Sequence, residues 1–413
     1  MTVITREQLV QLDARDPLAH FRDQFDLPAG VIYLDGNSLG PLPKAVKTRL
    51  VDVLENQWGR DLIKSWNLHD WVNLPQKAGA KIARLIGAQP GEVIAADSTS
   101  VNLFKLLSGA LPLRPERRAI VSDIDNFPTD LYMAQGINDL FGGKYELRFV
   151  CAEAIPAAID GDTAIVMLTQ VNYRTGARYD MWAITRLAHE HGALMLWDLA
   201  HSAGAFPVDL NGCDVDLAIG CGYKYLNGGP GAPAFLFVAE RHQRSIRPVL
   251  SGWFGHAAPF DFVPGYTPAD DLRRMLCGTP AVLGLAALDA ALDIFAGVEL
   301  ADVEKKSIAL SETFIALAEL HCADFGLVLA TPREPALRGS QVCFSHPHAY
   351  PVMQALIARG VIGDFRAPDI LRFGFAPLYL RYVDTWDAVM QIKDVLASGI
   401  WREPRFTQRN QVT

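Results

Sequence analysis

Short apolar runs alternate with stretches of helical periodicity through the middle of this chain. The apolar runs predict strands at Glu92–Asp97, Arg118–Ser122, Ala164–Thr169, Ala193–Asp198, Val215–Ile219 and Pro233–Val238. Several of these runs are unbroken, which is typical of strands buried on both faces. Between two of them, Met181–His191 carries Ile184, Leu187 and Ala188 on one helical face, and Gly192 follows where a helix would end. This alternation predicts an α/β fold with a mostly parallel, seven-stranded-type sheet that helices cover on both sides.

The two ends of the chain follow other patterns. Residues 1–45 are predicted to form an extended N-terminal arm, because Tyr33–Pro43 is too rich in Gly, Pro and Asn for a regular element. Residues 46–277 are expected to form a large domain. Beyond a hinge at Leu276–Pro280, residues 278–413 are expected to form a smaller α+β domain. Its predicted elements are the helices Ala281–Phe295, Asp302–His321 and Pro351–Arg359 and the strand Gln341–Ser345.

Composition limits the class of protein. The chain has 413 residues, half of them apolar, which is enough for more than one packed core. A formal net charge of -8 disfavours nucleic acid or an anionic membrane as a partner. The six cysteines form no C-x-x-C pair and match no zinc spacing, so we expect no metal site and a cytoplasmic location. We also expect neither a signal peptide nor a membrane span, because no suitable apolar run is found.

Polar residues follow the predicted strands at the points where the strands end. They are Ser98–Ser100, Asp123–Asp130, Thr169, Asp198 and Lys224. In an open α/β sheet, ligands bind at the carboxyl ends of the strands. We therefore expect these residues to surround one site.

Lys224 lies between two tyrosines, just before a glycine-rich loop, and Asp198 closes the earlier apolar run Ala193–Trp197. A lysine in such a place is usually a surface residue, and an aspartate at a strand end is often a helix cap. Together, however, they are the pair that a pyridoxal phosphate (PLP) site requires. The lysine forms a Schiff base with the cofactor, and the aspartate keeps the pyridine nitrogen protonated. His201 could face the same pocket, or it could simply bind a neighbouring backbone group.

Two other segments have both a structural and a functional interpretation. Ser98-Thr99-Ser100 opens a helix, as a capping sequence would, but a helix N-terminus with three hydroxyls also suits a phosphate group. Phe127 could be a core residue, or it could stack on the pyridine ring with Asp130 near that ring. The sequence leaves the choice for Phe127 open.

Arg372 lies inside the apolar stretch Asp369–Tyr379. A buried arginine requires a partner, and its planar guanidinium fits a carboxylate through two parallel hydrogen bonds. An internal Asp or Glu could be that partner. In an enzyme acting on an amino acid, the substrate carboxylate is the better candidate, so we predict a substrate-binding role.

Taken together, these residues resemble the kynureninases, PLP-dependent enzymes of fold type I that are similar to class V aminotransferases. The resemblance runs from the N-terminal arm to the Arg372 region. Its motifs are Tyr-Leu-Asp-Gly-Asn-Ser-Leu-Gly-Pro-Leu-Pro (33–43), Phe-Pro-Thr-Asp (127–130), Trp-Asp-Leu-Ala-His-Ser-Ala-Gly (197–204), Tyr-Lys-Tyr-Leu-Asn (223–227) and Gly-Trp-Phe-Gly-His (252–256). The first and last are particular to kynureninases, whereas the Asp…His and Tyr-Lys motifs recur among desulfurases and transaminases.

The resemblance implies hydrolysis of L-kynurenine to anthranilate and L-alanine by a cytoplasmic homodimer, in tryptophan catabolism or NAD biosynthesis. It implies that Lys224 forms the Schiff base with the cofactor, that Asp198 binds the ring nitrogen and that Arg372 binds the substrate carboxylate. The other implied cofactor contacts are His201, Phe127, Asp130 and Thr169 around the ring, and Thr99, Ser100 and Tyr223 at the phosphate. Trp253 and Thr279 would complete the phosphate site from the neighbouring subunit. Tyr223 would also act as a catalytic acid or base.

One position departs from the family pattern. Relatives often carry Asn in a stretch like Asn-Pro-Pro, where this chain has Gly278-Thr279-Pro280. A hydroxyl can still contact a phosphate, but the preference between kynurenine and 3-hydroxykynurenine is left open. Two alternatives also remain: another class V PLP enzyme, such as a cysteine desulfurase or an aminotransferase, and a non-catalytic sensor of PLP or an amino acid.

Overall fold

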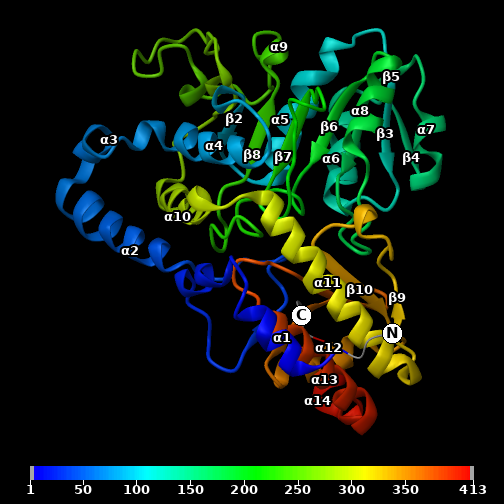
Figure 1. The fold of residues 1–413 in the computed structure, drawn as a ribbon. Helices are drawn as coiled ribbons and strands as arrows, with labels where there is room; N and C mark the ends of the chain where they lie inside the picture. Colours follow the sequence, from blue (N-terminus) through cyan, green and yellow to red (C-terminus); the bar gives the residue numbers. More distant parts are fainter. Residues whose placement is uncertain (1–3, 410–413) are drawn as a thin grey trace. The chain divides into compact units, whose positions relative to one another are not determined.

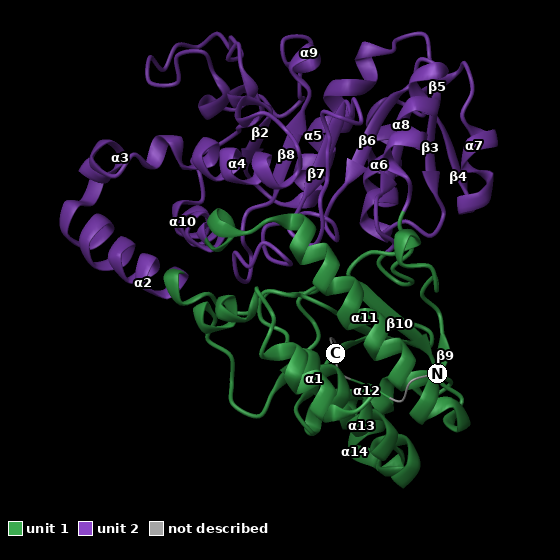
Figure 2. Ribbon diagram, viewed as in Figure 1, with its two compact units in different colours: residues 1–45, 173–178, 294–413 green, residues 46–172, 179–293 purple. Residues whose placement is uncertain are grey.

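The computed structural model describes residues 4–409 of the chain, and these residues divide into two compact units (Figures 1 and 2). Unit 1 comprises residues 1–45, 173–178 and 294–413, and unit 2 comprises residues 46–172 and 179–293. Within residues 4–409, no helix combines the length and the apolar character needed to cross a membrane.

Unit 2 is built on a seven-stranded sheet with the order β2-β8-β7-β6-β5-β3-β4. Strands β4, β3, β5, β6 and β7 run parallel, whereas β8 is antiparallel to both of its neighbours. The bounds are β2 (Val93–Ala95), β3 (Ala119–Asp123), β4 (Glu146–Val150), β5 (Thr163–Thr169), β6 (Leu194–Asp198), β7 (Leu217–Gly220) and β8 (Phe235–Val238). The predicted α/β class with a mostly parallel sheet is therefore confirmed.

Six of these strands coincide with predicted apolar runs, and β4 was missed. The six are buried along their whole length, whereas β4 lies at the end of the sheet and none of its residues is fully buried. Strand β2 at the other end of the sheet is buried, so the edge position alone is not the reason. Strand β4 is partly exposed, and Glu146 and Arg148 interrupt its apolar pattern.

The helices of unit 2 are α2 (Lys44–Asp52, which starts in unit 1), α3 (Ser65–Leu68), α4 (Leu74–Leu85), α5 (Thr99–Ala110), α6 (Pro128–Leu140), α7 (Ile155–Ala158), α8 (Met181–Glu190), α9 (Glu240–Gln243) and α10 (Val282–Leu292). Helices α4, α5, α7 and α8 pack against strands of the sheet, whereas α2 and α3 lie away from it (Figure 1). Helix α8 ends at Glu190, one residue before the predicted end, and Gly192 follows with a left-handed φ of 75°. Helix α5 buries Leu103, Leu106 and Leu107 in one core with residues of the central strands.

Unit 1 holds the antiparallel sheet β12-β13-β10-β9 and the pair β1-β11. The strands are β1 (Ile32–Tyr33), β9 (Val328–Leu329), β10 (Gln341–Ser345), β11 (Val361–Ile362), β12 (Asp364–Arg366) and β13 (Ile370–Gly374). The helices are α1 (Arg6–Asp13), α11 (Leu300–Cys322), α12 (Ala349–Ala358), α13 (Tyr382–Ser398) and α14 (Pro404–Thr407).

The segment before residue 45 is not extended throughout, because it contains α1 and a 3-10 helix at Ala19–Gln24. Helix α1 is bound to α13, since Arg6 pairs with Asp387 and Asp13 accepts the backbone N–H groups of Tyr382 and Val383. Domain boundaries at 45 and 277 stay predictions.

Candidate active site

The carboxyl edge of the unit 2 sheet gathers the polar residues that follow its strands. Thr169 at the end of β5 is the register partner of Asp198 at the end of β6, and Asp198 is the partner of Ile219 in β7. Lys224 follows β7 within a few residues. Parallel register therefore brings three of the predicted site residues to neighbouring positions on one edge.

Lys224 is partly exposed and points its ammonium at a histidine. Its Nζ lies 3.0 Å from Nε2 of His201 and 5.9 Å from the ring centre of Tyr223. His201 is buried, and the turn that carries it begins where Leu199 donates a backbone hydrogen bond to Ile219 of β7. The structure thus brings together Lys224, His201 and Tyr223, which the sequence places on two separate segments.

Asp198 belongs to a buried group of carboxyl and amide side chains. Its Oδ1 accepts the backbone N–H of Ala200 at 2.7 Å, and its carboxyl group is hydrogen-bonded to that of Asp130. Thr169 donates to Asp130 at 3.3 Å and also contacts Asn126. Burial raises the pKa of both carboxyl groups, most strongly for Asp130, while the charge of Lys224 opposes the rise at Asp198. The two carboxyl groups thus form a coupled pair, and the charge of Lys224 favours the ionised form of Asp198.

This arrangement fits a cationic ring nitrogen. A buried carboxylate is costly unless a positive charge or a hydrogen-bond donor compensates it. Asp198 has one backbone donor and the carboxyl group of Asp130 as neighbours, so a protonated pyridine nitrogen would supply the missing charge. The residues present at this edge therefore fit PLP.

The N-terminus of α5 has the features of a phosphate site. Ser98 is the N-cap, and its hydroxyl accepts the backbone N–H of Val101 at 3.3 Å. The hydroxyls of Thr99 and Ser100 are partly exposed and make no hydrogen bond with any described residue. The structural and functional interpretations of this segment thus apply to different residues, with Ser98 as the cap and two hydroxyls left available for an anion.

Phe127, Trp253 and Thr279 are all exposed in unit 2. Phe127 is 43% exposed at the start of α6, which argues against the core interpretation. Trp253 is 37% exposed, and its ring stacks on that of Phe262 with 5.9 Å between ring centres. Thr279 lies two residues after Cys277, whose carbonyl oxygen accepts the backbone N–H of Phe254. Their contacts with a cofactor stay predictions.

Arg372 lies on β13 of unit 1, where it is only 1% exposed. Its register partner on β12 is Asp364, and its guanidinium contacts both oxygens of that carboxylate, with Nε at 2.8 Å from Oδ1. Burial disfavours both charges, but their mutual attraction raises the pKa of Arg372 and lowers the pKa of Asp364. The expected two-bond contact exists, and its partner is the internal carboxylate that the sequence left as an alternative.

Some contacts of these sites were not predicted from the sequence. Asn126 fixes the loop before α6, since its Oδ1 accepts from Phe127 N at 2.7 Å and from Thr169. Lys105 of α5 is fully buried, and its Nζ contacts Asp97 and the carbonyl oxygen of Met275. A lysine among the apolar residues of α5 was an available signal, whereas nothing local identified Asp364 as the partner of Arg372.

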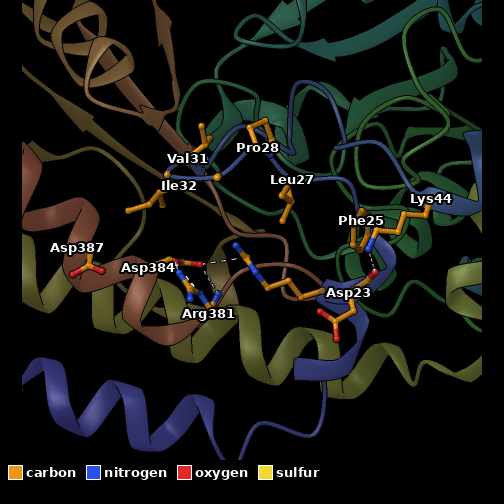
Figure 3. A pocket seen from close by; sticks show the side chains of 13 residues that line it. Asp23, Phe25, Leu27, Pro28, Val31, Ile32, Lys44, Arg381, Asp384 and Asp387 are labelled. Atoms are coloured by element: carbon orange, nitrogen blue, oxygen red, sulfur yellow. Dashed lines mark hydrogen bonds and ion pairs between the residues drawn. The ribbon is translucent and has the colours of Figure 1, made fainter.

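Unit 1 also has a cavity of about 440 Å³, which no predicted site residue lines (Figure 3). Its cations already have acceptors: Arg381 binds Asp384, Lys44 donates to the carbonyl oxygen of Asp23, and Arg22 lies 3.6 Å from Asp384. With these charges compensated, the cavity has no evident role in the chemistry above.

Comparison with solved structures defines the class of fold. A cysteine desulfurase from Thermococcus onnurineus NA1 superposes with a TM-score of 0.78 at 18% identity, over 92% of this chain and 98% of that chain. The cystine C–S lyase C-DES, in complex with its product cysteine persulfide, gives a TM-score of 0.77 at 18% identity, over 89% of this chain and 98% of that chain. The fold is that of the class V PLP-dependent enzymes.

Sequence comparison then defines the family. Kynureninase from Burkholderia pseudomallei (strain K96243) is 53% identical over 414 residues, which cover 99% of this chain and all of that protein. Kynureninase from Pseudomonas fluorescens is 51% identical with the same coverage. The family model for the kynureninase C-terminal domain matches residues 303–392. This chain belongs to the kynureninase family.

Proposed function

We infer that this protein is a PLP-dependent kynureninase, which hydrolyses the Cβ–Cγ bond of L-kynurenine to give anthranilate and L-alanine. The observation that carries this conclusion is identity of 53% with a kynureninase along the whole chain. The desulfurase alternative rests on structures that are 18–21% identical, which is a likeness of fold. A kynureninase is a hydrolase of carbon–carbon bonds in ketonic substrates.

The carboxyl edge of the unit 2 sheet provides the residues that would hold the cofactor. Lys224 would bind it covalently, Asp198 would accept the ring N–H, and His201 would lie beside Lys224. The phosphate would bind at the N-terminus of α5 through Thr99 and Ser100, with Tyr223 from the Lys224 segment. Phe127, Asp130 and Thr169 would line the ring, with Trp253 and Thr279 from a second subunit. When bound, PLP supplies an electron sink that stabilises negative charge on carbon atoms of the substrate.

Two side chains of the Lys224 segment are proposed to move protons. The amine of Lys224, once the substrate has displaced it from the cofactor, would remove the proton from Cα of the substrate, and His201, whose Nε2 lies 3.0 Å from Nζ, would orient the freed amine. The phenol of Tyr223 would act as acid or base when water adds to the γ-carbonyl and when Cβ is protonated. Arg372 would bind the α-carboxylate and so fix which end of the substrate enters.

A homodimer is proposed because unit 2 exposes many apolar side chains between residues 51 and 68. The exposed fractions are 47% for Val51, 46% for Leu54, 56% for Trp58, 60% for Leu62, 77% for Ile63 and 62% for Leu68. A concentration of exposed apolar side chains of this kind is typical of a protein–protein interface. We further propose a cytoplasmic enzyme of tryptophan catabolism or NAD biosynthesis, in keeping with the family.

The function is tested by incubating the purified holoenzyme with L-kynurenine and following anthranilate fluorescence. We expect turnover of kynurenine and no sulfide from L-cysteine. Parallel assays with 3-hydroxykynurenine establish the preferred substrate. Sulfide release without anthranilate would replace this proposal with a desulfurase.

A further inference from the structure

Within unit 1, the Tyr33–Pro43 motif packs against β13, the strand that carries Arg372. Strand β1 pairs with β11, Leu34 accepts the backbone N–H of Gly374, and the side chain of Ser38 reaches Asp364. The motif thus contacts both the strand that carries Arg372 and the carboxylate paired with it. A segment that looked too irregular for an element is therefore fixed by long-range contacts.

Four of the five N–H groups of Arg372 are already used inside unit 1. Nε donates to Asp364 Oδ1 at 2.8 Å, Nη2 donates to Asp364 Oδ2 and to Ser38 Oγ at 2.7 Å, and Nη1 donates to the carbonyl oxygen of Tyr173 at 2.7 Å. One N–H of Nη1 has no acceptor among the described residues. The bonds to Asp364 are buried, whereas the bonds from Nη1 to Tyr173 and from Nη2 to Ser38 are both part-buried. Asp364 therefore occupies the Nε–Nη2 edge of the guanidinium, and the N–H left for a ligand is on Nη1.

The charged side chains around Arg372 carry an excess of positive charge, which one more anion could compensate. Arg366 donates through Nη2 to the same Asp364 oxygen at 2.7 Å, so two guanidinium groups share one carboxylate. The nearby Asp35 does not balance them fully, because burial and the charge of Asp364 raise its pKa to about 7. A carboxylate ligand would compensate the remaining positive charge.

Ser38 links the two charged groups. Its hydroxyl donates to Asp364 Oδ2 at 2.7 Å and accepts from Arg372 Nη2, so it fixes the guanidinium relative to the carboxylate. The same motif also keeps buried polar atoms without partners among the described residues, including both side-chain polar atoms of Asn37. Natural proteins tolerate such a cost mainly where function requires it.

We propose that Ser38 and Asp364 are positioning residues, which hold Arg372 so that the Nη1 edge of its guanidinium receives the α-carboxylate of the substrate. This inference rests on the proposed function. The α-carboxylate is then bound by one N–H of Arg372 Nη1 and by the positive charge of Arg366 and Arg372. It does not receive two parallel hydrogen bonds from one guanidinium. The kynureninase-specific Tyr33–Pro43 motif thereby acquires a role in substrate binding.

The test compares ligands with and without the carboxylate on the Ser38→Ala holoenzyme. Loss of a hydrogen bond to a charged group should raise KM for L-kynurenine by about tenfold. The inhibition constant of kynuramine, the decarboxylated analogue, should stay within about twofold, because it has no carboxylate to lose. Ser38→Thr, which keeps the hydroxyl, should restore most of the affinity for kynurenine.

Ser311→Ala is the matched control, because Ser311 is a buried serine of α11 whose hydroxyl donates to the backbone of Ile308. It should leave KM unchanged. If Ser38→Ala does not yield folded enzyme by thermal unfolding, Ser38→Cys removes the strong hydrogen bond at nearly constant volume and is measured in its place. An unchanged KM in a folded Ser38 variant, or an equal rise for kynurenine and kynuramine, would overturn the inference. A wild-type enzyme that forms no anthranilate would instead overturn the proposed function, and this inference with it.

Discussion

At the scale of the residue, Lys224 derives its proposed role from two neighbours rather than from its own segment. His201 lies at hydrogen-bond distance from its amine, and Asp198 and Asp130 form a carboxyl pair close enough for the charge of Lys224 to act on Asp198. A lysine on an ordinary surface would have neither. The combination of one amine, one imidazole and one buried carboxylate is what PLP chemistry requires.

Lys224→Ala should abolish the visible absorption band of the covalently bound cofactor and lower kcat by about 100- to 10,000-fold, because the amine that moves the Cα proton is gone. Absorption spectra and anthranilate assays measure both effects. Lys305→Ala is the control, since Lys305 is an exposed lysine of α11 in unit 1. A Lys224→Ala enzyme that keeps its band and its activity would refute the assignment.

At the scale of the element, the Gly-Trp-Phe-Gly-His segment depends on a close approach of two backbones. A Cβ at position 252 would lie 2.1 Å from the carbonyl oxygen of Cys277, and Phe254 N donates to that same oxygen at 3.1 Å. The glycine therefore allows the Trp253 segment to contact the Cys277–Thr279 segment. Both carry residues predicted to contact the cofactor phosphate.

Gly252→Ala should destabilise the protein by about 1–3 kcal/mol, because a methyl group there must displace a backbone. It should also weaken PLP binding. Gly265→Ala provides the comparison, since a Cβ at that glycine meets nothing within 4 Å. Urea unfolding and titration of the apoenzyme with PLP measure the two effects, and equal stability of the two variants would contradict this account.

At the scale of the whole molecule, buried carboxyl groups make the stability depend on pH. Burial is the main cause that raises the pKa of Asp35 from 3.8 to about 7, and Asp364 adds to it, while Ser38, Arg372 and Arg366 oppose it. Between these two pH values the folded protein holds a proton that the unfolded chain has released. The contribution of Asp35 is therefore fully present below about pH 4 and is lost as the pH rises through about 7.

Asp35→Asn should remove this decrease of stability with rising pH. The free energy of unfolding of the variant minus that of the wild type should therefore increase between pH 5 and pH 8. Urea unfolding of the holoenzyme at several pH values measures the difference. The exposed Asp324→Asn of unit 1 should follow the wild type at every pH. Parallel curves for Asp35→Asn and the wild type would indicate that Asp35 titrates normally.

The sequence by itself determined the class of fold and predicts most of one site. Unbroken apolar runs reveal strands buried on both faces, and the polar residues after them predict the ligand edge, because both signals are local. Lys224, Asp198, Thr99 and Ser100 were predicted as site residues in this way. Strand β4 was missed because it is partly exposed and Glu146 and Arg148 interrupt its apolar pattern.

Only the tertiary structure decided the partners. Arg372 and Asp364 are eight residues apart, yet they meet because β12 and β13 pair in one antiparallel register, and Ser38 joins them from over 300 residues away. Asp130 meets Asp198 through neighbouring strand ends, and Lys105 meets Met275 across the core. A residue type and its position can suggest that a buried charge needs a partner, but register and long-range contacts choose which group compensates it.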